Sequence, residues 1–376
     1  MSEQYLKAWL HLYRAPGLGY SAIRQLLDCF GDAPTILRQK QFPKSLGLSS
    51  AQQQYLSQCR DNDLSDVLRW LDKDYNHILP IDDDLYPPQL KATADPPVLL
   101  FIKGRVESLL LPQLAVVGSR RATRGGLDNA RAFCYELAKK NWLITSGLAA
   151  GVDATAHRAA LDAGGETVAV MGTGINRIYP KDNQALAKEV MAQGAVVTEF
   201  DFDAPPRANH FPQRNRIIAG LSLGTLVVES GQKSGTLITA RLTYDMNRPV
   251  MAIPGSIHNP MAKGCHWLIK QGAALVESVD DIVTELEPGM TMLGEQIRRR
   301  MEKDHSQTVE NNDKQHDIDL SDNQRNILSH MGYDPISFDK LASVTEMPTA
   351  DLSADLLILE LTGLIEKRAG AKYLKR

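Results

Sequence analysis

The chain has 376 residues, more than the ~100–200 of a usual domain, which predicts two or three domains and a sizeable core. Its 42 Lys and Arg against 45 Asp and Glu give a formal net charge of -3, which excludes a uniformly basic nucleic-acid coat. Any polyanion site must therefore be local. The four cysteines lie far apart without a C-x-x-C pair, which argues against a zinc site or a disulfide framework and favours the cytoplasm. No signal sequence or apolar run of ~18 residues is present, so no membrane span is expected.

Residues 1–80 are predicted to form a small helical domain, because apolar residues recur there at helical spacing. The first two helices are joined by a turn whose Gly17 and Gly19 permit close backbone approach, and Ser21 is placed to cap the next helix. Such turns occur in helix-hairpin-helix modules that hold nucleic-acid phosphates on backbone amides. A turn that binds nothing explains the same residues equally well.

A second domain is predicted over residues 81–286. Two Pro-Pro pairs between residues 82 and 97 exclude regular helix and indicate a stiff linker, and the run from Val98 to Lys103 is predicted to be an edge strand. Beyond it, short Val-, Ile- and Leu-rich runs alternate with amphipathic stretches, a pattern typical of an α/β fold with a mostly parallel sheet and helices on both faces. Strands are predicted near residues 114–117, 142–145, 167–171, 195–199, 224–228, 249–253 and 273–276.

The loops at the carboxyl ends of these strands are the candidate binding sites, because ligands bind there in parallel sheets. In the first loop Gly118 permits a sharp turn, and the helix that begins near Gly126 points free N–H groups at the same spot. Side-chain donors are added by Ser119, Arg120, Thr123 and Arg124. An ordinary strand-to-helix loop with solvated arginines is the alternative.

The loop after the third strand carries Tyr179 between Arg177 and Lys181, a stacking ring flanked by cations that suits a nucleic-acid strand or a mononucleotide. Its Gly-x-Gly pair lacks the third glycine and the acidic ribose partner of a dinucleotide site, so neither NAD nor FAD is expected.

The stretch Pro205–Gly220 interleaves arginines with an aromatic ring. Guanidinium groups hold phosphate oxygens and an aromatic face stacks on a base, so the pattern favours an extended single strand. We expect at least one of its arginines to pair internally, for example with Glu199 or Glu229; Phe211 in the core is a further alternative. The residues concerned are Arg207, Asn209, His210, Phe211, Arg214, Asn215 and Arg216.

No catalytic activity is predicted. The loop with Ser234 and Thr236 is similar to a phosphate cradle, but the P-loop pattern is absent and no acidic strand would hold magnesium. Asp153 and His157 share a helical face without a nucleophile signature, so Asp153 is expected to orient a loop and His157 to pack. No catalytic residue, cofactor or metal ligand is therefore assigned.

Residues 287–318 are polar and are predicted to be a linker, helical at first. Residues 319–376 recover helical periodicity and end in two short strands around a turn at residues 369–371, which predicts a winged helix. Its would-be recognition helix, Ala350–Glu360, carries no Arg or Lys, so protein interaction is as good an expectation as DNA binding.

These motifs together resemble the DNA processing protein A family, also called Smf. The resemblance implies a helical domain like the sterile alpha motif, an extended Rossmann-like domain that dimerises and binds single-stranded DNA, and a winged-helix tail. The motifs, in chain order, are Gly118-Ser119-Arg120, Ser146 to Asp153, Gly172-Thr173-Gly174 with Tyr179-Pro180-Lys181, Phe211 to Gly220, Ser234 to Thr239, and Ile253 to Ser256.

The resemblance also implies that the protein binds strands without strong sequence preference, protects incoming DNA in natural transformation, and loads RecA against single-strand-binding protein, without being an enzyme. By motif, Arg120 and Lys181 are expected to contact phosphates, with Arg207 where some members have a lysine. The same pocket is expected to be lined by Ser119, Arg214, Asn215 and Arg216. With the side chains predicted above, the full DNA-binding set is Ser119, Arg120, Thr123, Lys181, Arg207, Phe211, Arg214, Asn215, Arg216, Ser234 and Thr236.

Two other functions stay open. Rossmann enzymes that cleave nucleoside monophosphates use a Gly-rich loop and a glutamate much like Ser230–Thr239 and Glu229, and release of free base would mark this activity. A transcription regulator acting through the winged helix would bind a specific duplex.

Overall fold

The computed structural model describes residues 2–58, 64–312, 321–331, 336–345, 347–348, 352, 355–356, 359, 364–368 and 372–375. The chain divides into two units, residues Met1–Arg300 and Met301–Arg376, and each is described by itself. None of the helices in these ranges combines the length and apolar character that crossing a bilayer requires.

The N-terminal part is helical, as predicted. Ser2 caps the first helix by accepting a hydrogen bond from the backbone N–H of Tyr5. The cap predicted for the second helix is wrong, because that helix begins at Tyr20, which places Ser21 inside it and Gly19 at the N-cap position. The helices are α1 (Glu3–Arg14), α2 (Tyr20–Phe30), α3 (Ala33–Leu37), α4 (Ser50–Gln58) and α5 (Ser65–Leu71).

A nine-stranded sheet forms the centre of residues Met1–Arg300, in the order β1-β2-β6-β5-β4-β3-β7-β8-β9. The seven strands from β3 to β9 pair in parallel, whereas β1 and β2 are antiparallel. The predicted mostly parallel sheet and its seven strand positions are thus confirmed. The strands are β1 (Asn76–Pro80), β2 (Leu99–Gly104), β3 (Gln113–Val117), β4 (Leu143–Ser146), β5 (Thr167–Val170), β6 (Ala195–Thr198), β7 (Gly224–Val227), β8 (Val250–Ala252) and β9 (Ala274–Leu275).

The predicted edge position of β2 is wrong, because β1 pairs with it on its outer side, from Asn76 opposite Lys103 to Pro80 opposite Leu99. Pro80 lacks a backbone donor and is tolerated in β1 because β1 is itself the edge strand. β1 joins this sheet although it lies within residues 1–80, the range predicted for the helical domain. The boundary at residue 80 stays a prediction.

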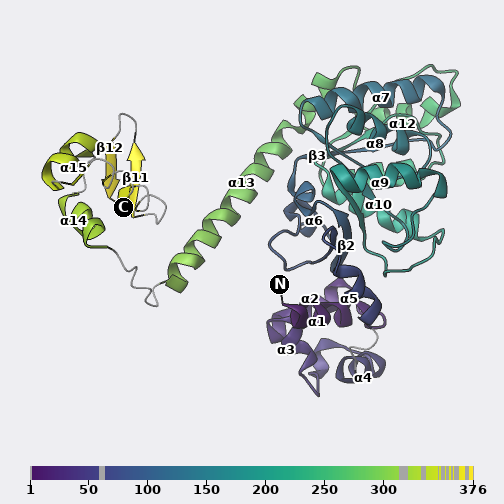
Figure 1. The fold of residues 1–376 in the computed structure, drawn as a ribbon. Coiled ribbons are helices and arrows are strands. Elements are labelled where there is room, and N and C mark those ends of the chain that lie inside the picture. The colour runs from purple at the N-terminus through teal and green to yellow at the C-terminus, as the bar shows by residue number, and fades with distance from the viewer. Residues whose placement is uncertain are drawn as a thin grey trace. The chain divides into compact units, whose positions relative to one another are not determined.

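Helices cover both faces of the sheet (Figure 1). One core cluster joins α7 (Arg124–Lys139), α8 (Val152–Asp162) and the first turns of α13 (Val279–Asn312) to the strands. A second joins the strands to the N-terminal helices, so these share one core with β2. Its other helices are α9 (Gln184–Gln193), α10 (His210–Leu221), α11 (Thr236–Asp245) and α12 (Lys263–Lys270), and a short α6 (Pro88–Lys91) lies within the predicted stiff linker.

The strand order creates a switch point beside β3. The chain proceeds from β3 through β4, β5 and β6 on one side, then returns by α10 to β7 on the other side of β3. The loops after β3 and β7 therefore run in opposite directions from the carboxyl ends of these strands. Ligands of parallel sheets bind in the crevice between two loops that diverge in this way.

The unit Met301–Arg376 contains the end of α13 and the winged helix predicted over residues 319–376. A three-stranded sheet in the order β10-β12-β11 packs with helices around a core that includes Ile327, Leu341 and Tyr373. The predicted turn at residues 369–371 and most of Ala350–Glu360 lie outside the described residues. The elements are α14 (Asp322–His330), β10 (Ile336–Ser337), α15 (Phe338–Thr345), β11 (Ile365–Arg368) and β12 (Lys372–Lys375).

Candidate nucleic-acid interface

A cavity of about 480 Å³ lies at the switch point beside β3. Its walls come from the loop after β3, the start of α10, and the loop that leads into α11. The fold brings most of the predicted DNA-binding set together here, and seven of its residues line the cavity: Ser119, Arg120, Phe211, Arg214, Asn215, Ser234 and Thr236. The other four, Thr123, Lys181, Arg207 and Arg216, do not line it.

A cation and two aromatic rings lie together at the cavity. The guanidinium carbon of exposed Arg120 lies 5.6 Å from the ring centroid of Phe211, and the ring centroid of Tyr179 is 5.6 Å from that of Phe211. Lys181 follows Tyr179 by two residues and is exposed, and no ion pair engages it within the described chain. This cluster of exposed cations beside aromatic faces suits phosphates and bases at once.

Arg214 carries its charge beneath the cavity. Its side chain is buried, and Nη1 donates to the backbone oxygens of Gly147, at 2.6 Å, and Val170. A Cβ on Gly147 would lie 2.6 Å from the guanidinium, so a larger residue at this position would displace Arg214. Burial lowers the pKa of Arg214 to about 10 and neighbouring Asp153 opposes that shift, so the guanidinium stays charged at neutral pH.

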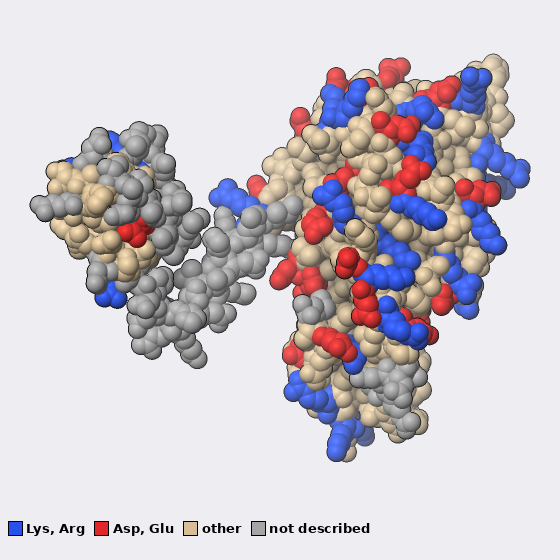
Figure 2. Space-filling view, in the orientation of Figure 1, with Lys and Arg blue, Asp and Glu red and all other residues tan. Residues whose placement is uncertain are grey.

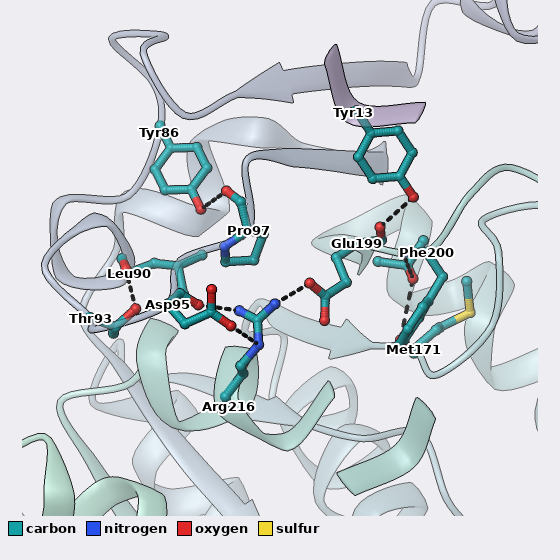
Figure 3. Close-up of polar contacts among 11 residues, drawn as sticks. Tyr13, Tyr86, Leu90, Thr93, Asp95, Pro97, Met171, Glu199, Phe200 and Arg216 are labelled. Atoms are coloured by element: carbon teal, nitrogen blue, oxygen red, sulfur yellow. Dashed lines mark hydrogen bonds and ion pairs between the residues drawn. The ribbon is translucent and has the colours of Figure 1, made fainter. Parts of the chain in front are cut away.

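Arg216 is engaged elsewhere (Figure 3). Its guanidinium lies between Asp95 and Glu199, donating to the backbone oxygen of Asp95 at 2.5 Å and pairing with the Glu199 carboxylate. The expectation that one arginine pairs internally with Glu199 is confirmed. The expectation that Arg216 lines the shared cavity is wrong, because this pair holds the guanidinium at another surface of α10. Burial raises the pKa of Glu199 to about 7, against the opposing charge of Arg216.

The N-terminal end of α7 is occupied by an internal carboxylate. Thr123 caps the helix by accepting from the N–H of Gly126 at 3.1 Å, and its own N–H and hydroxyl donate to Glu229 at 2.8 and 2.7 Å. From the sequence we expected these N–H groups to face the loop's own anion site. Instead the N–H of Gly126 donates to the Thr123 hydroxyl and that of Thr123 donates to Glu229, and Thr123 and Glu229 line a separate cavity of about 180 Å³.

The hydroxyls at the start of α11 tie the two diverging loops together. Ser234 accepts from the backbone N–H of Thr236 at 3.2 Å, and the Thr236 hydroxyl donates to the carbonyl of Gly118 at 3.2 Å. Arg207 is exposed just before α10. On the face shown in Figure 2, Lys and Arg side chains are interspersed with Asp and Glu, which agrees with a local site on a nearly neutral surface.

Two titratable residues beside the cavity have the roles predicted for them. His157 is fully buried with Nδ1 2.7 Å from the hydroxyl of Thr167, and burial lowers its pKa to about 3. Asp153 accepts from the N–H of Ala149 at 3.3 Å and so orients the loop after β4. Burial raises the pKa of Asp153, opposed by Arg214.

Sequence reasoning missed one contributor, Ile238, and did not predict the contacts of a second, His210. Ile238 of α11 lines the cavity and is 41% exposed; its spacing of four residues from Ser234 was the available signal. His210 stacks on Phe200 at 4.1 Å between ring centroids and hydrogen-bonds the carbonyl of Gly172, which anchors the start of α10. Nothing in the local sequence distinguishes this histidine from a solvated one. Among the residues described, no three metal-binding side chains cluster.

Comparisons with known proteins identify relatives of both units. The family model described as DNA recombination-mediator protein A matches residues 77–287, and that described as DprA winged helix domain matches residues 312–371. Protein Smf of Escherichia coli (strain K12) is 41% identical over 320 residues, which covers 85% of this chain and 83% of that protein. DNA processing protein DprA of Streptococcus pneumoniae (strain ATCC BAA-255 / R6) is 44% identical over 205 residues, 54% of this chain and 72% of that relative.

Two solved structures share the fold. The X-ray structure of DNA processing protein A from Streptococcus pneumoniae aligns with a TM-score of 0.66 at 35% identity, over 74% of this chain and 97% of that one. DNA processing protein A from Helicobacter pylori aligns with a TM-score of 0.51 at 26% identity, over 57% of this chain and 97% of that one. The Helicobacter pylori structure concerns the single-stranded DNA binding mode of that protein.

Proposed function

Because this chain belongs to the DNA recombination-mediator protein A family, we propose that it binds single-stranded DNA in the cavity at the switch point. The observation that carries the proposal is the Arg120 guanidinium held 5.6 Å from the ring of Phe211, with the buried charge of Arg214 beneath. The single-stranded DNA binding mode of the Helicobacter pylori relative supports the choice of a single strand. A flexible single strand offers phosphates and unstacked bases to such a site, whereas duplex bases are hidden in the stack.

In this proposal the role of each predicted residue follows from its position relative to the cavity. Arg120 and Lys181 contact phosphates, Phe211 and Tyr179 stack on bases, and Arg207 extends the path beyond the cavity. Arg214 contributes its positive charge from a buried position and Thr123 acts through its contact with Glu229, whereas Arg216 pairs with Glu199 and stabilises the fold. The polar lining consists of Ser119, Asn215, Ser234 and Thr236. Stacking and phosphate contacts read no base identity, so binding is largely independent of sequence.

We further propose that the protein works as a homodimer in the cytoplasm, protects single strands, and loads RecA on them in competition with single-strand-binding protein. The family's description as a recombination mediator supports this role. Exposed apolar side chains of α12 and of the short edge strand β9, Trp267 and Leu275, supply a surface for the dimer. The proposal includes no catalytic step, and the acid that a nucleotide-cleaving enzyme would need, Glu229, is 7% exposed and hydrogen-bonded to Thr123 and Asn259.

The test of DNA binding is a fluorescence-anisotropy titration of a labelled poly-dT strand and of a duplex of the same length, at two salt concentrations. We expect preference for the single strand and affinity that falls as salt rises. Arg120→Ala should weaken binding about tenfold and reduce the salt slope by about one. Arg131→Ala is the matched control, because Arg131 is an exposed arginine on α7 that does not line the cavity. Equal affinity for both DNAs, or an affinity indifferent to salt, would refute the proposal.

RecA loading is tested separately by following RecA's ATPase on single strands already covered by single-strand-binding protein. The wild-type chain should shorten the lag before hydrolysis, and Arg120→Ala should not. A lag that the wild-type chain leaves unchanged would count against the mediator role while leaving DNA binding intact.

A further inference from the structure

Glu229 follows β7 and is 7% exposed, yet its carboxylate accepts three hydrogen bonds from two other loops. The N–H and hydroxyl of Thr123 donate at 2.8 and 2.7 Å, and the amide nitrogen of Asn259 donates at 3.1 Å. The loops that follow β3, β7 and β8 therefore meet at one side chain. Such a fully hydrogen-bonded buried group holds its partners in one arrangement.

The position of this carboxylate also determines whether the N-terminal end of α7 can bind a phosphate. The first turn of a 16-residue helix presents free N–H groups and positive potential, which favour an anion. Glu229 is that anion, supplied by the chain itself. DNA phosphates are therefore kept from this helix end and must be held by the side chains around the larger cavity.

Arg120 lies between two fixed points. Ahead of it, the carbonyl of Gly118 accepts from the hydroxyl of Thr236 at 3.2 Å; behind it, Thr123 is bound to Glu229. Within the described chain no ion pair restrains Arg120 itself, and its guanidinium lies against the ring of Phe211. The place of its guanidinium thus depends on how the backbone of the loop is held.

Resting on the proposed single-stranded-DNA function, we propose that Glu229 is a positioning residue that holds the loop of residues 118–123 so that Arg120 stays over Phe211. The carboxylate touches no DNA and acts through Thr123. The DNA affinity of a Glu229 variant distinguishes this role from a simple effect of charge. Loss of a positioning group weakens DNA binding, whereas loss of a mere negative charge near a phosphate site strengthens it.

The first variant is Glu229→Gln, which keeps the size of the side chain but turns one of its acceptors into a donor facing other donors. Affinity for poly-dT should fall about tenfold, equivalent to about 1.4 kcal/mol, and the salt slope should fall toward that of Arg120→Ala because the displaced Arg120 loses its phosphate contact. In an Arg120→Ala background the same substitution should change affinity less than about twofold, because it acts through Arg120. A general folding defect would instead weaken both backgrounds equally.

The second variant retains the Glu229 residue but displaces its carboxylate. A Cβ at Gly126 would clash with the Glu229 carboxyl group, so Gly126→Ala should displace the carboxylate and reproduce the loss of affinity. Gly125→Ala is the matched control, since its Cβ would meet nothing closer than the Thr123 hydroxyl at 4.0 Å. Both substitutions add an alanine to the first turn of α7, and alanine favours helix over glycine. Thermal melts of both variants check that the fold is retained.

The outcomes separate the inference from the function on which it rests. A wild-type chain that fails to prefer the single strand overturns the proposed function. A wild-type chain that does prefer it, while Glu229→Gln and Gly126→Ala bind as tightly or more tightly, overturns only the positioning role. Equal tenfold losses with and without Arg120 would overturn it too.

Discussion

Replacing Arg216 by methionine should destabilise the fold without removing a lining residue of the cavity. The change leaves Glu199, whose side chain is 10% exposed, without its ion-pair partner. Within the described chain the other carboxylate oxygen, Oε1, is already buried without a hydrogen bond, so Arg216 is the main compensation for burial. Breaking one side of a buried pair costs about 3–5 kcal/mol, and we expect the free energy of unfolding to fall by that amount at high pH.

The loss should depend on pH in a defined direction. Burial already raises the pKa of Glu199 from 4.5 to about 7 with Arg216 present, and removing the cation raises it further. A raised folded-state pKa gives stability that is present below the unfolded value and lost as pH rises through the folded value. In Arg216→Met the pKa of Glu199 lies above that in the wild type, so the free energy of unfolding keeps falling above pH 7. The difference in stability between variant and wild type should therefore be larger at pH 8.5 than at pH 6.

Urea unfolding followed by tryptophan fluorescence at pH 6 and pH 8.5 measures both effects. Arg216→Met/Glu199→Gln is the decisive companion, because a neutral amide costs far less to bury than a carboxylate; the double variant should recover most of the stability and lose the extra pH dependence. A deficit that is equal at both pH values, or a double variant no more stable than the single one, would refute this account of the pair. Anisotropy with poly-dT should meanwhile show the affinity of folded Arg216→Met within about twofold of the wild type.

Three further predictions concern the same region. Because burial lowers the pKa of His157 from 6.5 to about 3, stability should decrease as pH falls below 6.5, by up to about 1.4 kcal/mol per unit; urea unfolding of wild type and His157→Asn should show a shallower slope in the variant. Gly147→Ala should displace Arg214 and cost about 1–3 kcal/mol of stability, seen as a lower urea midpoint, and it should weaken poly-dT binding. Tyr13→Phe should cost only about 0.5–1.5 kcal/mol in the same unfolding assay, because it removes one hydrogen bond to the carbonyl of Glu199 and keeps the ring.

The central sheet could be predicted from the sequence because the parallel strands from β3 to β8 are short buried runs made mostly of β-branched or aliphatic residues. β3 and β5 are buried at every position, and their polar residues, Gln113 and Thr167, stand only at the start of each strand. β1 could not be found the same way, since Asn76 and Pro80 frame a run too short to distinguish from the end of a helical segment. Its pairing with β2 follows from the tertiary structure.

The cavity's residue types were predictable, but the partners of individual side chains were not. Arg120 and Arg216 belong to similar polar stretches, and only the fold shows that one is exposed while the other pairs with Glu199. Thr123 and Glu229 are separated by 106 residues, so no local pattern connects them. The sequence therefore predicts which loops meet. Only the three-dimensional fold shows which of their charged side chains pair internally and which are exposed.

That sorting accounts for how a chain of net charge -3 can present a site for a polyanion. Three carboxylates of this unit are each offset internally: Glu229 by the N-terminal end of α7, Glu199 by Arg216, and Asp153, which lines the cavity, by Arg214 and by the rise in pKa that burial causes. Arg120 and Lys181 then carry exposed charges with no ion-pair partner in the described chain. A local positive site thus arises from burying and pairing anions, and it needs no excess of Lys and Arg over the surface as a whole.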